Sequence, residues 1–316
     1  MADSQSKGLY RIAAVIVTYF PDYTLLEKGV SAIVPQVDAV LVVDNSGSAD
    51  MVRWVGERAF GSKVNVVSMG LNAGVGEAHN RGISWAISHE YTHVLLLDQD
   101  SLPHREMVKN LFTAILELQR RGIRVSAVGP RYIDPRTGHS SAIVRFGLLK
   151  FKTIYCEQVL QPYIRADFLV SSGCLISLST IAQVGPMDAS LFIDHVDTEW
   201  FLRANRHGYG AYVVCEALME HLLGDRPLRI WLGRWRSLPR HSPVRYYYIF
   251  RNSILLYKRD YARMRWIVND VLRLVMIFAA LMAVGSPRRH HAGMILEGLL
   301  DGARGRSGPY RGNKET

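Results

Sequence analysis

The sequence predicts an α/β fold with a mostly parallel, Rossmann-like sheet and helices on both of its faces. One observation is a series of short apolar runs rich in β-branched residues, at residues 12–18, 39–43, 64–67 and 93–97. The other is a series of helix-like stretches that alternate with them, at residues 24–34, 49–60, 75–89 and 105–121. Short apolar runs of this kind are typical of buried strands, and their alternation with helices favours a doubly wound sheet.

The chain beyond residue 125 is less regular. The expected elements are strands at 126–128 and 212–214, a helix at 196–207, and an apolar run at 168–176 that Ser171-Ser172-Gly173 interrupts. From Pro243 onward the sequence looks wholly helical.

These patterns suggest two parts. We expect a main domain over residues 1–240, with a nucleotide-binding half at about 10–125 and an acceptor half at about 126–240. A basic helical extension would follow over residues 241–316. At 316 residues, the chain is long enough to bury a substantial core.

Positive charge is concentrated at the end of the chain. The net charge is +10, and residues 225–316 alone contribute +12, from 18 Lys/Arg against 6 Asp/Glu. Such a region suits nucleic acid, an anionic membrane or solubility, and charge alone does not choose among them. Residues 226–251 mix arginine with aromatic side chains, but we expect no nucleic-acid partner.

The cysteines and the first residues bear on the cellular compartment. Cys156, Cys174 and Cys215 are too few and too scattered for a disulfide framework or a cysteine-based zinc site, so we expect reduced thiols. No apolar run of signal-peptide length precedes residue 12, so we expect a cytoplasmic protein.

Polar residues follow each of the first four predicted strands. They are Thr18-Tyr19, Asp44-Asn45, Asn72-Ala73-Gly74 and Asp98-Gln99-Asp100. Ligands of doubly wound sheets bind beyond the carboxyl ends of the strands. We therefore expect these four groups to converge on one crevice.

The pair Asp98 and Asp100 suggests a metal site. Two carboxylates at positions i and i+2 after a strand can both reach one divalent cation, and oxygen ligands suit Mg²⁺ or Mn²⁺, which bridge diphosphates. The alternative is an acidic turn that caps the following helix, with Ser101 as its N-cap.

A second acidic segment, Phe192 to Trp200, reads FIDHVDTEW and holds three carboxylates near the start of a predicted helix. The helix dipole would stabilise one or two of them, whereas three beside aromatic residues favour a general base that faces an acceptor hydroxyl. Glu220-His221 follows the strand at 212–214, and His221 could be a metal ligand or a structural histidine.

Residues 72–82, NAGVGEAHNRG, form a glycine-rich junction between strand and helix, as is used to bring backbone close to a nucleotide or phosphate. The spacing is not that of the dinucleotide fingerprint, and no Walker P-loop is present, which counts against a nicotinamide enzyme.

Taken together, these motifs resemble glycosyltransferase family 2, and within it the rhamnosyltransferase branch that serves rhamnolipid and O-antigen synthesis. The matching segments, in order, are VIVTYFPD (15–22), VVDNS (42–46), GLNAGVGEAHNRG (70–82), LLLDQDS (95–101), SSGCLIS (171–177), LFIDHVDTEWFLRA (191–204) and EH (220–221), with RYYYIFRN (245–252) also familiar. The resemblance covers about residues 12–222 and implies a GT-A fold.

The resemblance also implies roles for individual residues. Those expected to bind the donor are Thr18, Tyr19, Asp44, Asn72, Gly74, Asn80, Asp98, Gln99 and Asp100. Asp98, Asp100 and His221 would hold Mg²⁺ or Mn²⁺. The family pattern places the base at Asp197, although Val196 replaces the usual first acid of the pair, and Asp194 and Glu199 remain candidates for a catalytic role.

The implied reaction is an inverting, metal-dependent transfer of L-rhamnose from dTDP-L-rhamnose to a hydroxyl of a glycolipid or lipid-linked saccharide. Nothing in the composition or spacing identifies rhamnose. Another family 2 donor such as UDP-galactofuranose, or a non-catalytic protein that binds carbohydrate or nucleic acid, stays open, as does a homo-oligomer.

The apolar stretch at 266–284 is interrupted by Asn269, Asp270 and Arg273. Eleven uninterrupted apolar residues from Leu274 are too short to span a bilayer. Because arginines flank the stretch, we expect it to lie in the membrane interface, which would place the protein peripherally on the cytoplasmic face of the inner membrane.

Overall fold

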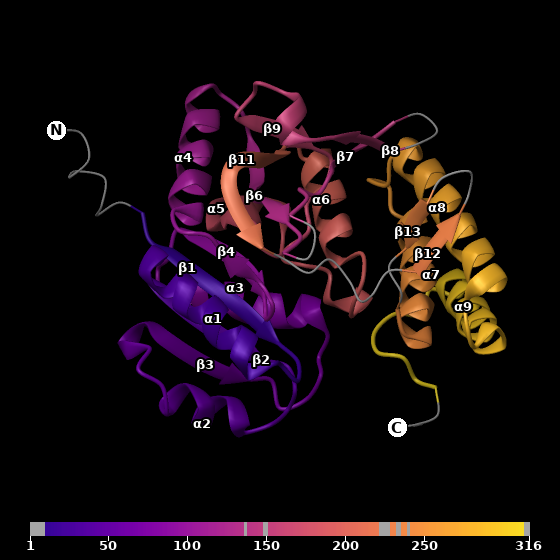
Figure 1. Cartoon of the computed structure of the whole chain (residues 1–316), viewed down its shortest axis with the longest axis horizontal. Coiled ribbons are helices and arrows are strands. Elements are labelled where there is room, and N and C mark those ends of the chain that lie inside the picture. The colour runs from indigo at the N-terminus through magenta and orange to yellow at the C-terminus, as the bar shows by residue number, and fades with distance from the viewer. Residues whose placement is uncertain are drawn as a thin grey trace.

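The computed structural model describes residues 10–135, 138–147, 151–220, 228–231, 235–238 and 241–312. Their arrangement is an α/β body with a layer of helices beside it (Figure 1). The predicted α/β fold class is confirmed.

A nine-stranded mixed sheet forms the centre of the body, in the order β3-β2-β1-β4-β10-β6-β11-β5, with β9 also paired to β11. The strands are β1 (Ile12–Thr18), β2 (Ala39–Asp44), β3 (Val64–Ser68), β4 (His93–Asp98), β5 (Leu102–Pro103), β6 (Val125–Ile133), β9 (Tyr163–Ala166), β10 (Leu175–Ser177) and β11 (Gly210–Glu220). The first four are parallel, as predicted, and β10 joins them antiparallel to β4.

Helices cover both faces of this sheet, because successive strand residues point to opposite sides. In β1, Ala13, Val15 and Val17 belong to one core, and Ala14 and Ile16 belong to the other. The first core is covered by α3 (Val75–Ser88), α5 (Leu178–Val184) and α6 (Val196–Arg206), and the second by α1 (Tyr23–Ile33), α2 (Asp50–Gly56) and α4 (Met107–Arg120).

The second half departs from prediction in two places. Only Leu175–Ser177 of the apolar run at 168–176 lies in a strand, because the chain turns at Gly173, which has a φ of +79°. The strand predicted at 212–214 is one part of β11, which extends over eleven residues.

Short elements complete the described structure. Two hairpins stand outside the main sheet, β7 (Ile143–Phe146) with β8 (Phe151–Ile154) and β12 (Leu228–Trp231) with β13 (Trp235–Leu238). The 3₁₀ turns are η1 (Val34–Gln36), η2 (Gly61–Lys63), η3 (Cys156–Gln158) and η4 (Ala189–Leu191).

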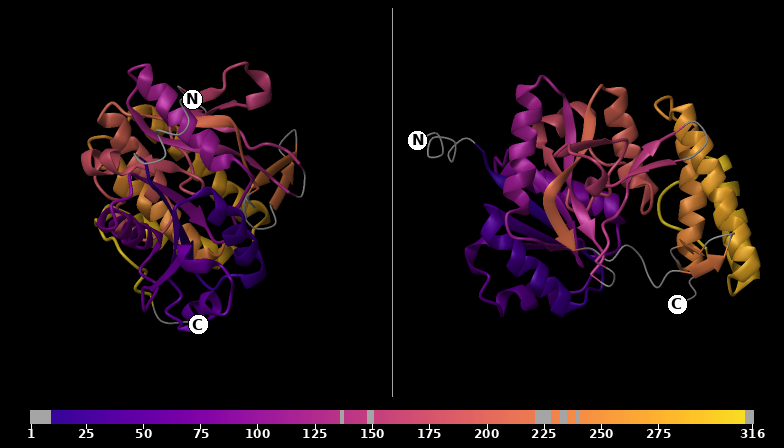
Figure 2. Two further views of the ribbon diagram at one scale, coloured as in Figure 1. Left: turned by 90° about the vertical axis from the view of Figure 1, so that its left-hand side faces the viewer. Right: turned by 45° about the horizontal axis from the view of Figure 1, so that its top comes forward.

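The helical extension contains α7 (Pro243–Tyr257), α8 (Met264–Val284) and α9 (Arg288–Ala303), as the sequence predicted. Figure 2 shows these helices as a layer beside the α/β body, with the β7–β8 hairpin reaching toward them. Leu255, Leu256 and Trp266 pack into the core that also contains α6. The extension is therefore bound to the main domain, and the predicted boundary at residue 240 stays a prediction.

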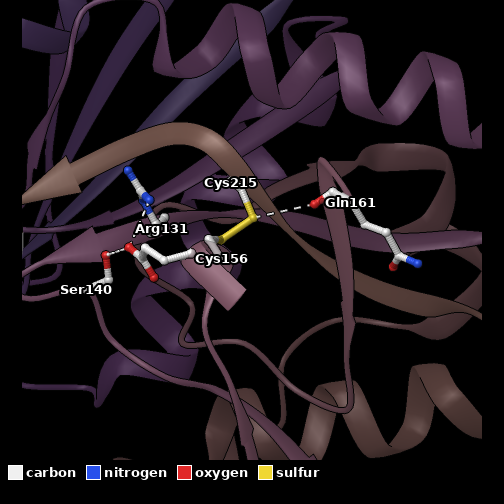
Figure 3. The surroundings of a disulfide bond; sticks show 6 residues. Arg131, Ser140, Cys156, Gln161 and Cys215 are labelled. Atoms are coloured by element: carbon white, nitrogen blue, oxygen red, sulfur yellow. Dashed lines mark hydrogen bonds and ion pairs between the residues drawn. A yellow bond between two sulfur atoms is a disulfide. The ribbon is translucent and has the colours of Figure 1, made fainter. Parts of the chain in front are cut away.

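The prediction of three reduced thiols was wrong. Cys156 and Cys215 form a disulfide, with their Cα atoms 5.6 Å apart (Figure 3). Cys174 is a free, buried thiol. Spacing in the sequence concealed this pair, because the two cysteines are 59 residues apart. Pairing of β9 with β11 brings their segments together, and residue spacing does not reveal such pairing.

Candidate functional site

The ends of β1 and β2 form a small pocket. Thr18 and Asp44 are paired in register, and the Thr18 hydroxyl donates to Asp44 Oδ1 at 3.1 Å. Asp44 lines a cavity of about 200 Å³ together with Phe20, Pro21, Tyr23, Ser46, Ser48, Asp50 and Met51. The Oδ2 atom of Asp44 is buried and has no hydrogen-bond partner among the described residues. A buried acceptor without a partner suits the ring N–H of a pyrimidine base.

Gln99 links two of the predicted strand-end groups. Its side-chain oxygen accepts a 2.7 Å hydrogen bond from the backbone N–H of Tyr19. The Tyr19 ring is about half exposed, at 49%, and is therefore available at the rim of the crevice. The structure thus brings the end of β1 against the segment that follows β4.

The glycine-rich junction is ordered by two asparagines. Asn45 donates to Asn72 at 3.0 Å and accepts from the backbone N–H of Ala73 at 2.9 Å. Asn72 also accepts from the backbone N–H of Gly74. Asn72 and Gly74, both predicted to bind the donor, therefore lie in one turn next to the end of β2.

Gly74 is needed where this junction meets the second acidic segment. Its φ is +86°, and a Cβ atom at this position would lie 2.5 Å from the carbonyl oxygen of Phe192. The next residue, Val75, donates its backbone N–H to the same oxygen at 2.8 Å. The two motifs are consequently in direct contact, although they are far apart in the sequence.

Asn80, which the family resemblance places beside the donor, lies on α3. Its amide group donates to the carbonyl of Met187 and accepts from the backbone N–H of the same residue, both at 2.9 Å. These contacts tie α3 to the chain before α6, which is a structural role.

A loop formed by residues 171–173, the serine loop, connects the two predicted acidic motifs. Ser172 Oγ accepts the backbone N–H of Asp98 at 3.0 Å and lies 2.6 Å from Ser101 Oγ. The backbone N–H of Ser171 donates to Asp197, which also accepts from the backbone N–H of Thr198 at 2.7 Å. The serine loop thereby places Asp98 and Asp197 at one site.

Asp197 has the electrostatic character of a general base. The pKa of its carboxyl group is raised to about 6, mainly by burial and also by the nearby carboxylates of Asp194 and Asp98, against the lowering effect of two backbone N–H groups. A carboxylate with this pKa is ionised at neutral pH and still accepts a proton readily.

The metal site predicted from the sequence lies partly within the described residues. Asp98 and Asp100 supply oxygen donors that suit Mg²⁺ or Mn²⁺. Within the described ranges, no group of three or more His, Cys, Asp or Glu side chains is arranged to hold a metal ion. The third predicted ligand, His221, lies outside these ranges, but the preceding residue, Glu220, pairs with Leu102 just beyond Asp100.

The backbone before α6 is strained. Phe192, Asp194 and His195 all adopt positive φ angles, of 67°, 58° and 64°, although none is glycine. Such a conformation costs free energy and persists only where surrounding contacts enforce it, often at functional sites. We call residues 191–197 the acceptor loop.

The enforcing contacts come from α7. The fully buried side chain of Asn252 donates to the carbonyl oxygens of Leu191, Ile193 and Asp194, at 2.7–3.0 Å. Arg251, also buried, donates to the Leu191 carbonyl at 3.0 Å. Sequence reasoning missed these two residues, even though the stretch that contains them, residues 245–252, was noted as familiar.

The other two acids of the segment are paired. Asp194 accepts from Arg245 of α7 at 3.2 Å. Glu199 is 1% exposed and accepts from Arg203 at 2.7 and 2.8 Å and from the Tyr261 hydroxyl at 2.6 Å. These contacts give Glu199 a structural role, so Asp197 is the acid best placed for proton transfer.

A larger pocket, of about 460 Å³, lies beside the acceptor loop. Asp194, His195 and Thr198 line it from one side. Trp266, Asp270 and Arg273 line it from α8, and Val144, Thr153, Phe168, His241 and Ile249 complete it. The polar residues of α8, which interrupt an apolar helix, were not predicted to belong to a site.

His195 shows how α8 orders this pocket. Burial lowers the pKa of the imidazole to about 4, so the ring is neutral at pH 7. Its Nε2 atom lies 3.0 Å from Nη2 of Arg273, which can only donate, so Nε2 is the acceptor and Nδ1 carries the proton. Arg273 is held in place by Asp270, at 2.6 and 2.8 Å.

The matching family model and the solved structures agree with this geometry. The model described as "Glycosyl transferase family 2" matches residues 14–174. A solved structure of GalNAc-T7 with UDP, GalNAc and Mn²⁺ aligns with 76% of this chain, at a TM-score of 0.55 and 14% identity. The structure of S. aureus TarS aligns with 88% of this chain, at a TM-score of 0.51 and 13% identity. The chain spans less than half the length of either, 48% and 43%, so they show the fold alone.

Two curated proteins are also similar. The dTDP-rhamnosyl transferase RfbF of Shigella flexneri is 29% identical over 304 residues, which cover 96% of this chain and 98% of that protein. The low-salt glycan biosynthesis hexosyltransferase Agl10 of Haloferax volcanii is 24% identical over 211 residues, 64% of each chain.

Proposed function

We propose that this chain, which belongs to glycosyltransferase family 2 and is a glycosyltransferase, moves L-rhamnose from dTDP-L-rhamnose to a hydroxyl group of a lipid-linked saccharide. The donor is suggested by similarity over nearly the whole length to a dTDP-rhamnosyl transferase. The GT-A fold and the enzymatic activity follow from the family.

One observation carries the proposal: Asp44, Asp98 and the serine loop that contacts Asp197 lie along the same edge of the sheet, at the ends of neighbouring strands. Asp44 presents an acceptor without a partner in a pocket suited to a base. The serine loop binds both Asp98 at the end of β4 and Asp197 at the start of α6. A nucleotide sugar that extends from Asp44 to the serine loop would present its anomeric carbon near Asp197.

Asp197 acts as the general base in this account. Its ionised carboxylate removes the proton from the acceptor hydroxyl while that oxygen attacks the anomeric carbon. Attack from the side opposite the leaving diphosphate inverts the configuration. The backbone N–H groups of Ser171 and Thr198 hold the carboxylate in a fixed position, which keeps the base oriented toward the acceptor.

Asp98 and Asp100 would hold Mg²⁺ or Mn²⁺, with His221 as the predicted third ligand. Such a cation, when bound, offsets negative charge on the departing nucleoside diphosphate. The oxygen donors of the pair suit this cation and the diphosphate that it bridges.

The pocket between the acceptor loop and α8 is the proposed site of the acceptor saccharide. It is adjacent to the base, because Asp194 and Thr198 line it and Asp197 lies between them in the sequence. Its lining combines aromatic rings with charged and neutral hydrogen-bonding groups, which is the composition expected of a site for a polar ligand with apolar faces. Asp194, fixed by Arg245, is placed to position an acceptor hydroxyl.

Donor binding tests the proposal directly. Isothermal titration of the purified protein with dTDP-L-rhamnose and UDP-galactofuranose, each with Mg²⁺, is expected to give binding of the first alone. Asp44→Asn is expected to weaken it, and Asp260→Asn, which changes an exposed acid outside this pocket, serves as the control. Preferential binding of the galactofuranose donor would replace the proposed substrate and keep the reaction class.

A further inference from the structure

The helical extension presents an apolar surface that no described part of the chain covers. Large hydrophobic side chains of α8 and α9 are exposed, namely Met264, Val271, Leu272, Val275, Met276, Phe278, Val284, Leu296 and Leu300. Val275 and Met276 are 59% and 57% exposed, which is far from burial in a core. Single exposed apolar residues are ordinary, whereas a contiguous set along two helices indicates an interaction surface.

A groove runs within this surface. It has a volume of about 560 Å³ and is lined without exception by apolar or aromatic residues. They come from three helices: Phe250, Ile254 and Tyr257 of α7, Val271, Leu274, Val275 and Phe278 of α8, and Ala292, Ile295, Leu296 and Leu299 of α9. The groove therefore offers no polar group that would bind a hydrophilic ligand.

Positive charge surrounds the apolar surface. Residues 258–312 contain ten Lys/Arg and four Asp/Glu, a net charge of +6. Arg263 and Arg265 stand at the start of α8, and Arg288 and Arg289 stand at the start of α9. All four are exposed, and within the described part of the chain none of them forms an ion pair. The pattern of apolar face and basic rim is complementary to an anionic lipid surface.

The length of α8 does not exclude a membrane-spanning helix, in contrast to the estimate from the eleven-residue apolar run. The helix has 21 residues and a mean hydropathy of 2.1 over its most apolar window, which is enough to cross a bilayer by length and composition. The contacts of its polar side chains argue against a membrane-spanning position. Asn269 and Asp270 are buried against the protein, and Arg273 bonds to His195 of the acceptor loop. Insertion across the bilayer would break these contacts.

We propose that the exposed face of α8 and α9 docks on an anionic bilayer, with the groove receiving apolar lipid chains. A second copy of the chain fits less well, because pairing of two such faces would bring their basic rims together. Trp266, Asp270 and Arg273 of the same α8 line the acceptor pocket, so docking would place that pocket next to the membrane. Docking on a bilayer does not depend on the proposed function; only the link between docking and a lipid-linked acceptor rests on it.

Vesicle flotation tests the docking without using activity. Wild-type protein is expected to float with phosphatidylcholine vesicles that contain phosphatidylglycerol, and to float less with phosphatidylcholine alone. Val275→Glu should lower the bound fraction on the order of tenfold, because a charge replaces an apolar contact with the bilayer. Ile87→Glu on α3, which changes a side chain of similar exposure, should leave it unchanged.

A charge-reversed pair tests the basic rim. Arg288→Glu with Arg289→Glu is expected to abolish the preference for phosphatidylglycerol, since each basic residue near an anionic surface contributes measurably to binding. Arg120→Glu at the end of α4 is the matched control. Unchanged circular dichroism of each variant would show that the fold is retained.

Three results would overturn the docking proposal: wild type that stays with the soluble fraction, a Val275→Glu variant that floats like wild type, or light scattering that shows a dimer lost in this variant. The last would assign the face to a second copy of the chain. Donor binding measured on the same preparations keeps failure of docking distinguishable from failure of the proposed function.

Discussion

The nucleotide-binding half and the acceptor half hold their site residues in different ways. In the first, Thr18, Asp44 and Asp98 are the last residues of the neighbouring parallel strands β1, β2 and β4. In the second, the acceptor loop has a strained backbone. It is held by residues of α7 and α8 that lie 51 to 78 positions further along the sequence. We therefore expect donor binding to depend on the topology of the sheet, and the chemistry to depend on contacts from the helical extension.

The largest expected effect comes from Asp197→Asn, which removes the base and keeps the shape of the side chain. We expect turnover to fall by about a thousandfold, within the range for general base catalysis, with donor affinity unchanged. Steady-state kinetics and titration of donor check the two parts. A variant that retains more than a tenth of wild-type turnover would move the base elsewhere.

Asp197→Asn should not destabilise the fold. Because the folded-state pKa of about 6 lies above the ordinary value of 3.8, the folded protein favours the protonated acid, and the free energy of unfolding falls as pH rises through this window. At neutral pH the neutral amide should leave the melting temperature equal or higher. A loss of several degrees would show that Asp197 is mainly structural.

Asp98→Asn changes the nucleotide-binding half at its proposed metal site. Activity is expected to fall by about a hundredfold or more, because the cation no longer offsets charge on the leaving group. The dependence of the rate on added Mg²⁺ or Mn²⁺ should shift to higher concentration. Asp38→Asn, at the far end of the same sheet, is the control. Unchanged metal dependence in Asp98→Asn would contradict the assignment.

Asn252→Ala tests whether the extension holds the acceptor loop. Removal of three hydrogen bonds to strained backbone is expected to lower kcat by about tenfold to a hundredfold, since misplacement of a catalytic group by about 1 Å has effects of this size. Affinity for donor should be retained, which separates a local effect from unfolding. Equal losses of kcat and donor affinity would mean that the two halves are not independent.

The pH dependence gives a smaller effect. The base must be ionised, so kcat/KM should rise with pH and level off above an apparent pKa of about 6. From about pH 7 to about pH 5 the rate is expected to fall by about tenfold. A profile that is flat across this interval, measured with the wild type at constant ionic strength, would remove Asp197 from the rate-determining proton transfer.

Much of the nucleotide-binding half could be predicted from the sequence. Strands β1 to β4 are short apolar runs, and polar residues mark their ends, so local patterns place Thr18, Asp44 and Asp98 on one edge. The family resemblance added Asp197. The strand-end predictions use residues that are close together in the sequence, and the family resemblance uses motifs that occur in the same order along the chain.

The rest depends on contacts that local patterns do not reveal. The family resemblance places Asn80 beside the donor, but it does not reveal that the Asn80 side chain bonds to Met187, which is 107 residues away. Arg273 looked like an interruption of an apolar helix, but it bonds to His195 of the acceptor loop. Cys156 and Cys215 were expected as thiols and form a disulfide.

The most direct measurement of the central claim is release of nucleoside diphosphate from a panel of nucleotide sugars, with Mg²⁺, Mn²⁺ or EDTA. We predict release from dTDP-L-rhamnose alone, abolished by EDTA and by Asp197→Asn. Release from every donor at equal rates, or none from dTDP-L-rhamnose in the presence of either metal, would contradict a metal-dependent rhamnosyl transfer at this site.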